Sequence, residues 1–230
     1  MNENLKVLIV DDDADTRLLI RKSLQGLHYN TIEVSSGEDA IEIIENGIGD
    51  IDVMLLDILM SGMDGFSVLR HLKENPKASQ TKTIMLTTID QTEHKVRALS
   101  MGASDYIVKP FDKAELVARI GMQARLKKAE TAVMESEEKF SKAFNSNAAL
   151  MVIGTFEHDQ FIEVNESFLK TMGFERTEVI GRTSSELEMF ADSNQRDFLY
   201  QEVKQCGFAR DIDVSIKTKN GEIRHVLFSA

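Results

Sequence analysis

The sequence has little cysteine, no long apolar run and no excess of positive charge. Its single cysteine, Cys206, excludes a disulfide framework within the chain and favours a reducing compartment. No apolar run is long enough to cross a bilayer, and the polar start Met-Asn-Glu-Asn is not typical of a signal peptide. The formal net charge of -11 argues against a broad nucleic-acid-binding surface. We therefore expect a cytoplasmic protein without a membrane span or a nucleic-acid partner in this chain.

Short apolar runs alternate with helical patterns over the first half of the chain. The runs are rich in Val, Ile and Leu, as strands buried on both faces are. This alternation predicts an α/β fold with a parallel sheet, in which ligands bind beyond the carboxyl ends of the strands. We expect strands over 5–10, 30–34, 51–57, 82–88 and 104–108. Helices are expected near 14–27, 37–46, 64–74 and 91–101, with another beginning near Lys113.

Acidic side chains gather where the first and third expected strands end. Asp11 and Asp12 follow the first strand, and Asp57 closes the third. If these two strands are neighbours, three carboxylates meet at one rim of the sheet. Adjacent carboxylates repel and are costly to desolvate, so a cation is expected among them. Oxygen ligands of this kind suit Mg²⁺.

Two more polar groups stand at the ends of the last two expected strands. The fourth strand leads to the hydroxyl of Thr87, and the fifth leads to the ammonium group of Lys109, whose bond to Pro110 is a candidate for cis. Each feature alone is weak, because an aspartate pair is often a solvated turn and a Lys-Pro pair is uninformative. Their conjunction at one rim predicts a phosphoryl-transfer site in which Asp57 is the nucleophile.

Four stretches resemble the motifs of a known family. VLIVDDDADTR, LLDILMSGMDGF, IMLTT and YIVKPF look like those of the response-regulator receiver domain of two-component signalling. The resemblance covers about residues 4–123. It implies a flavodoxin-like, doubly wound sheet of five parallel strands in the order 2-1-3-4-5. We therefore assign residues 1–123 to a receiver domain.

The resemblance implies a role for each acidic residue. Asp57 resembles the phosphoacceptor, and it would bind Mg²⁺ together with Asp11, Asp12 and the backbone carbonyl of Leu59. A phosphatase of the haloacid dehalogenase type also uses an aspartate nucleophile. That class normally needs a second aspartate at the position that Leu59 occupies here, so we reject it. The loop departs from the receiver pattern at Ser61, where the family usually has proline.

The other implied roles belong to the response to phosphorylation. Thr87 and Tyr106 resemble the receiver's switch pair, and Lys109 resembles the lysine that pairs with a phosphoryl oxygen. A histidine kinase or a phosphotransfer protein would supply the phosphoryl group. Thr87 would then move towards the phosphate, and Tyr106 would follow into the space left. The receiver would catalyse only its own phosphorylation and dephosphorylation.

A long helical segment follows the receiver motifs. Residues 112–145 contain no proline and one glycine, and a mostly apolar seam runs along them at alternating spacings of four and three. The seam consists of Met122, Leu126, Ala129, Val133, Ser136, Phe140 and Ala143. It predicts a coiled-coil-like linker over 124–145 that joins two copies in a homodimer. A helix packed on its own domain is the alternative, and the many Lys and Glu residues through 127–139 favour an exposed connector.

The last part of the chain alternates between strands and short helices. Turns are expected at His158-Asp159 and Asn220-Gly221, and helices near 165–172, 175–180 and 193–206. This pattern predicts an α+β antiparallel domain over 146–230. The stretches FSKAFNSNAALMVIG, FIEVNESFLKTMGF and EVIGRTSSEL resemble a PAS sensory domain. Because that fold has a fifth, central strand, we expect this domain to be truncated at its last strand or completed by another chain.

The PAS-like half offers no recognisable cofactor site. Cys206 lacks the context of a flavin-reactive cysteine, and the expected helix at 193–206 contains no histidine for a haem. We therefore expect either no bound cofactor there or a small metabolite that the sequence does not identify. The two halves together predict a phosphorelay response regulator that signals to a PAS or output region. The alternative is the N-terminal part of a multidomain enzyme, such as a hybrid histidine kinase or a cyclic-dinucleotide cyclase or phosphodiesterase.

Overall fold

The structure is a computed structural model that describes residues 5–46, 51–75, 80–88 and 92–230. The chain divides into two compact units, Met1–Met134 and Glu135–Ala230. Over the described residues, every helix is too short or too polar to pass through a bilayer.

Five parallel strands form the sheet of the first unit. Their order is β2-β1-β3-β4-β5, which confirms the predicted doubly wound arrangement. The strands are β1 (Leu5–Val10), β2 (Tyr29–Val34), β3 (Val53–Asp57), β4 (Lys82–Thr87) and β5 (Asp105–Val108). Because β1 and β3 are neighbours, the residues that follow Val10 and those that follow Leu56 reach the same rim.

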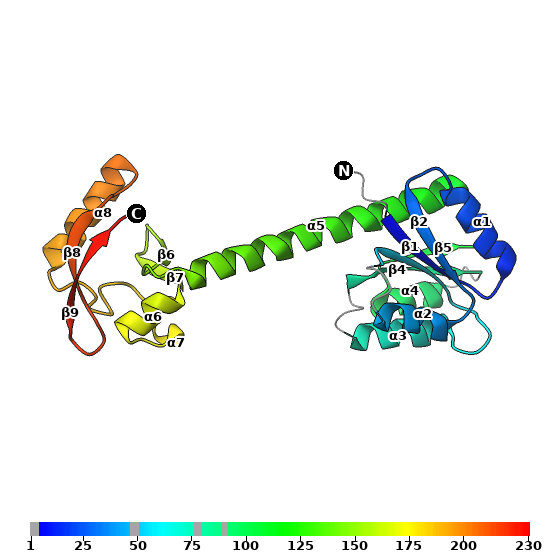
Figure 1. Ribbon diagram of the computed structural model, residues 1–230, viewed down its shortest axis with the longest axis horizontal. Coiled ribbons are helices and arrows are strands. Elements are labelled where there is room, and N and C mark those ends of the chain that lie inside the picture. Colours follow the sequence, from blue (N-terminus) through cyan, green and yellow to red (C-terminus); the bar gives the residue numbers. More distant parts are fainter. Residues whose placement is uncertain (1–4, 47–50, 76–79, 89–91) are drawn as a thin grey trace. The chain divides into compact units, whose positions relative to one another are not determined.

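Helices cover both faces of this sheet (Figure 1). They are α1 (Ala14–Leu24), α2 (Gly37–Glu45), α3 (Gly65–Glu74), α4 (Thr92–Ser100) and α5 (Lys113–Ser146). Alternate residues of each strand face opposite sides, so Met54 and Leu56 pack with the layer of α2 and α3, whereas Val53 and Leu55 pack with the layer of α1 and α5. All four side chains are fully buried, as expected for a parallel sheet covered on both sides.

Short polar side chains start several of these helices. The carboxylate of Asp13 accepts hydrogen bonds from the backbone N–H groups of Asp15 and Thr16 at the beginning of α1. Ser36 and Asp64 cap α2 and α3 in the same manner. Each cap satisfies N–H groups that have no partner within the helix. Asp13, the third aspartate of the acidic run, is therefore a helix cap.

Helix α5 keeps contact with the sheet well beyond its buried first turns. Lys127 donates to the carbonyl of Ile51 at 2.7 Å and pairs with Asp52 at 3.2 Å. Three residues further on, Glu130 pairs with Lys82 at 2.7 Å. Part of the segment predicted as a linker is therefore held against the first unit by polar contacts, which the apolar spacing could not indicate.

The second unit contains two antiparallel hairpins and three helices of its own, besides the C-terminal end of α5. Strands β6 (Val152–Thr155) and β7 (Gln160–Val164) form one two-stranded sheet, and β8 (Ile212–Lys217) and β9 (Ile223–Phe228) form another. The helices are α6 (Glu166–Met172), α7 (Arg176–Val179) and α8 (Ser193–Cys206). These antiparallel strands confirm the predicted α+β class for this half.

The two expected turns lie between the paired strands. Asp159 in the first turn and Gly221 in the second have positive φ values of 52° and 84°. Aspartate tolerates this left-handed conformation better than most residues, and glycine adopts it freely. Both dipeptides therefore act as the turns that the sequence predicts.

Candidate functional site

The carboxyl ends of β1 and β3 bring three aspartates together. Oxygen atoms of Asp11, Asp12 and Asp57 all lie within 4.8 Å of one another. Asp11 is fully buried, Asp57 is 6% exposed, and Asp12 lies on the open side of the group. The three acids meet because Val10 pairs in register with Leu56. This is the convergence that the strand pattern predicts.

Lys109, which directly follows β5, supplies the positive charge. Its Nζ lies 2.7 Å from Oδ2 of Asp11 and 3.0 Å from Oδ1 of Asp57. The backbone N–H of Lys109 donates to the carbonyl of Thr87 at 2.7 Å, which fixes the start of the loop. The bond between Lys109 and Pro110 is cis, as expected. One ammonium group thus bridges two largely buried carboxylates.

Burial and pairing shift the pKa values of these side chains in opposite directions. Burial raises the pKa of the Asp57 carboxyl above its ordinary value, and the hydrogen bond from Lys109 offsets only part of that rise. Burial alone would lower the pKa of Lys109, but hydrogen bonds to Asp11 and Asp57 raise it overall. A hydrogen bond from the backbone N–H of Ser61 lowers the pKa of Asp12. A positive charge beside Asp57 therefore favours its ionised form.

The surrounding backbone fixes the site in ways the sequence did not suggest. Nη1 of Arg17 donates to the carbonyl of Asp11 at 2.6 Å, which ties α1 to the end of β1. A Cβ atom added at Gly65 would lie 2.2 Å from the carbonyl oxygen of Asp57, so α3 can begin close to the site only with glycine there. Arg17 stands at the end of the quoted DDDADTR motif. A hydrogen bond from a side chain to a backbone carbonyl has no recognisable spacing in the sequence, so this contact could not be predicted.

The predicted switch residues lie on adjacent strands. Thr87 is buried at the end of β4, and Tyr106 is partly buried on β5, where it packs against the layer of α2 and α3. Tyr106 pairs in register with Met85, two residues before Thr87. The guanidinium carbon of Arg119 lies 5.9 Å from the centre of the Tyr106 ring. Both residues thus lie beside the rim, and their movement stays a prediction.

The donor set of the site fits a hard divalent cation. Three carboxylates offer oxygen atoms on one side of the rim, and Mg²⁺ is usually bound through one or two carboxylates together with water. The exposed position of Asp12 leaves space for such water. Leu59, whose backbone carbonyl the resemblance implies as a further ligand, follows Asp57 by two residues in the loop after β3. The residues present therefore fit Mg²⁺.

The second unit has a polar cluster of its own. The carboxylate of Asp159 accepts hydrogen bonds from the hydroxyl of Tyr200, from Nη2 of Arg196 at 2.9 Å and from the hydroxyl of Ser184 at 2.7 Å. Burial raises the pKa of Tyr200, and the bond to Asp159 adds to the rise. The guanidinium group of Arg196 is the cationic partner of this carboxylate. The cluster ties the turn between β6 and β7 to α8.

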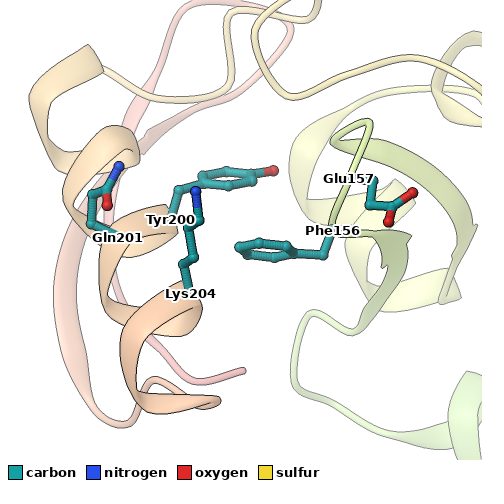
Figure 2. A pocket seen from close by; sticks show the side chains of 5 residues that line it. All are labelled: Phe156, Glu157, Tyr200, Gln201 and Lys204. Carbon is teal, nitrogen blue, oxygen red and sulfur yellow. The ribbon is translucent and has the colours of Figure 1, made fainter.

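An aromatic pocket lies next to this cluster (Figure 2). The ring of Phe156 stacks on that of Tyr200 with their centres 5.5 Å apart, and Lys204 lies on the next turn of α8. A larger and mostly apolar cavity of about 500 Å³ lies within the same unit. Two of its lining groups, Asp159 and Ser184, are polar but already paired with each other.

Comparison with known proteins agrees with this architecture. The sequence-family model of the response regulator receiver domain matches residues 7–121, and the family model of a PAS domain matches residues 147–230. The probable transcriptional regulator ycf27 of Guillardia theta is 36% identical over 142 residues, which cover 62% of this chain and 53% of that protein. The transcriptional regulatory protein HprR of Escherichia coli is 35% identical over 131 residues, covering 57% of this chain and 56% of that protein. The chain thus spans about half the length of these two relatives.

Solved structures also resemble the first unit. A putative response regulator from Chloroflexus aurantiacus is 30% identical with a TM-score of 0.50, and the match covers 53% of this chain and 98% of that one. A putative two-component system response regulator/GGDEF domain protein is 28% identical with a TM-score of 0.51, over 55% of this chain and 51% of that one. Together with the acidic rim, the bridging lysine and the strand order, these matches establish that the chain belongs to the response-regulator receiver family, with a PAS domain after the receiver.

Proposed function

We propose that Asp57 accepts a phosphoryl group from a histidine kinase or a phosphotransfer protein. The observation that best supports this role is the position of the Lys109 ammonium group, 2.7 Å from Asp11 and 3.0 Å from Asp57. It favours the ionised form of a buried carboxylate at the rim of the sheet, where a nucleophile needs its negative charge. We also propose a cytoplasmic location.

The chemistry follows from the side chains at the rim. A carboxylate oxygen of Asp57 forms a bond to phosphorus, and the bond between phosphorus and the donor breaks, with its electron pair leaving on the donor's imidazole nitrogen. Mg²⁺, held by Asp11, Asp12, Asp57 and the carbonyl of Leu59, would neutralise the phosphoryl oxygens. Lys109 then exchanges its bond to Asp57 for one to a phosphoryl oxygen.

The response would travel through the elements that carry Thr87 and Tyr106. We propose that Thr87 hydrogen-bonds the new phosphate and that Tyr106 turns inward after it. Tyr106 lies on β5 beside Arg119 of α5, so its movement changes the surface from which α5 starts. The receiver domain would span 1–123 and the coiled-coil-like linker 124–145. The PAS-like domain would span 146–230.

Replacing the phosphoacceptor tests this proposal. Asp57→Asn should abolish labelling by acetyl phosphate in the presence of Mg²⁺, because an amide cannot act as the nucleophile. Asp13→Asn is the matched control: Asn caps a helix as well as Asp does, and Asp13 lies outside the acidic trio. Labelling is read by Phos-tag electrophoresis. Undiminished labelling of Asp57→Asn, or equal loss in both variants, contradicts the assignment.

We further propose that two copies of the chain pair along α5. Every residue of the predicted seam is exposed, and the four large ones, Met122, Leu126, Val133 and Phe140, are about half exposed. The stripe repeats with the heptad spacing that a second, identical helix would match. Ion pairs between Glu135 and Lys139 and between Glu138 and Lys142 lie along the same helix, outside the seam. A homodimer would bury this apolar surface.

A charge in the seam should disrupt the proposed dimer. Val133→Lys together with Phe140→Lys places like charges opposite each other, so we expect a dimer of the wild type and a monomer of the variant at micromolar concentration. Glu135→Lys, on the opposite side of α5, should stay dimeric, since exposed ion pairs contribute little. Light scattering after size exclusion gives the mass of each. A monomeric wild type, or a dimeric double variant, contradicts pairing through the seam.

The second candidate function is that of a multidomain signalling enzyme. One matched structure is that of a putative two-component system response regulator/GGDEF domain protein, and the match covers 51% of that chain. We propose as the alternative that this chain is the N-terminal part of such a multidomain signalling enzyme, for example a cyclic-dinucleotide cyclase or phosphodiesterase or a hybrid histidine kinase. Reading the natural sequence beyond residue 230 distinguishes the two. The chemistry at Asp57 is the same in both.

A further inference from the structure

The loop between β3 and α3 makes a direct contact with the acidic trio. The backbone N–H of Ser61 donates to Oδ2 of Asp12 at 2.7 Å. Ser61 and Asp12 are 49 residues apart in the sequence, so this bond joins the loop to the end of β1. Asp12 is the exposed member of the trio, and Asp11 and Asp57 are held by burial and by Lys109 instead.

The loop holds this N–H group in a defined place. Its first residue, Ile58, donates to the carbonyl of Leu86 at 3.0 Å, and Gly65 donates back to the carbonyl of Ile58 at 3.0 Å. Gly62 has a φ of 85°, which only glycine adopts without strain. These bonds hold the two ends of the loop together and attach it to β4. They therefore hold the backbone N–H of Ser61 in place relative to the sheet.

A fixed donor has a clear consequence for a metal ligand. A carboxylate on the surface rotates freely, and binding a cation then costs the entropy of stopping that rotation. Engaging Oδ2 of Asp12 orients the carboxylate and leaves Oδ1 available for a cation. A hydrogen bond that orients a metal-binding side chain, from a group that does not itself bind the metal, commonly changes metal affinity about 10- to 100-fold.

We propose that Ser61, through its backbone N–H, is a positioning residue for the Mg²⁺ site: it holds Asp12 in the orientation that binds the cation. This inference rests on the proposed function. Because the donor belongs to the main chain, every amino acid except proline supplies it. The usual receiver residue at this position, proline, would therefore lack the bond, and this chain would gain Mg²⁺ affinity from its serine.

The test is a direct Mg²⁺ titration of the full chain by isothermal calorimetry, without a phosphodonor. Ser61→Pro removes the N–H and should weaken Mg²⁺ binding about tenfold. Ser61→Ala removes only the hydroxyl and keeps the N–H group, so its affinity for Mg²⁺ should stay within about threefold of that of the wild type.

The outcomes separate this inference from the proposed function. If the wild type binds Mg²⁺ and Ser61→Pro binds it equally well, the positioning role is wrong and the site stands. Equal weakening in Ser61→Ala and Ser61→Pro would assign the effect to the hydroxyl and also overturn the inference. A wild type that binds no Mg²⁺ would overturn both.

A second measurement does not depend on the proline variant folding. In Asp12→Ala the acceptor is gone, so the amide hydrogen of Ser61 should exchange with solvent about tenfold faster than in the wild type, the factor expected for one lost hydrogen bond. Nuclear magnetic resonance of the labelled chain follows this one amide. Unchanged exchange would mean that the bond does not hold Asp12 in solution.

Discussion

Replacing Lys109 by Met should cost the metal-free receiver unit about 3 kcal/mol of unfolding free energy, because removing one partner leaves buried charge uncompensated. The ammonium group lies between Asp11, which is fully buried, and Asp57. Without it, two neighbouring carboxylates repel each other in a site with little water. Methionine keeps most of the length of the side chain, so lost packing contributes little.

The effect should depend on Mg²⁺ and on pH. Added Mg²⁺ supplies the missing positive charge, so it should raise the melting temperature of Lys109→Met more than that of the wild type. The deficit should also shrink as the pH falls towards 3.8, because burial raises the pKa of Asp57 and protonation removes its negative charge. In the wild type, the stability contributed by Lys109 is present below its ordinary pKa of 10.5 and is lost as the pH rises through its raised value.

Thermal unfolding followed by circular dichroism measures these differences. Lys22→Met is the matched control, since Lys22 is exposed in the last turn of α1, and it should change stability by less than about 0.5 kcal/mol. If Lys109→Met were as stable as Lys22→Met without Mg²⁺, the lysine would not be compensating the buried acids.

Replacing Asn165 by Ala should destabilise the PAS unit by about 4 kcal/mol. Asn165 is fully buried at the start of α6. Its Oδ1 accepts from the backbone N–H groups of Met151 and Phe168 at 3.0 and 2.9 Å, and its Nδ2 donates to the carbonyls of Phe144 and Ala149 at 3.0 and 2.9 Å. Alanine removes a helix cap and leaves several buried backbone groups without a partner, each costing about 1 kcal/mol or more.

Hydrogen exchange measured by mass spectrometry reports this loss for each unit separately. We expect peptides from 147–230 to lose protection in Asn165→Ala, whereas peptides from the receiver unit keep it. Asn194→Ala is the control, because Asn194 is exposed in the first turn of α8 and makes no comparable network. Equal protection in the two variants would show that the buried amide does not hold this unit together.

In the receiver half, the sheet and the acidic site could be predicted from the sequence. The apolar runs predict the parallel strands, and once β1 and β3 are neighbours the meeting of Asp11 and Asp57 follows from geometry. Lys109 is predicted for the same reason, since it follows the last strand. What could not be predicted is the set of bonds to main-chain atoms. The bonds from Arg17 to a carbonyl and from Ser61 through its N–H depend on loop paths that have no period in the sequence.

The PAS half was predicted less completely for a related reason. Alternation and turn residues predict the hairpins, but a buried asparagine such as Asn165 looks in the sequence like an ordinary helix cap. Its further bonds appear only when Phe144 and Ala149 are brought beside it. The pairing of Asp159 with Arg196 joins a turn to a helix 37 residues away and likewise has no local signal.

The most direct test of the account is to locate the phosphoryl group itself. The full chain is incubated with acetyl phosphate and Mg²⁺, the acyl phosphate is trapped by reduction with borohydride, and the modified residue is identified by peptide mass spectrometry. We predict that Asp57 alone among the carboxylates is modified and that chelating Mg²⁺ prevents the reaction. Modification at Asp11, at Asp12 or outside the rim, or equal modification without Mg²⁺, would contradict the central claim.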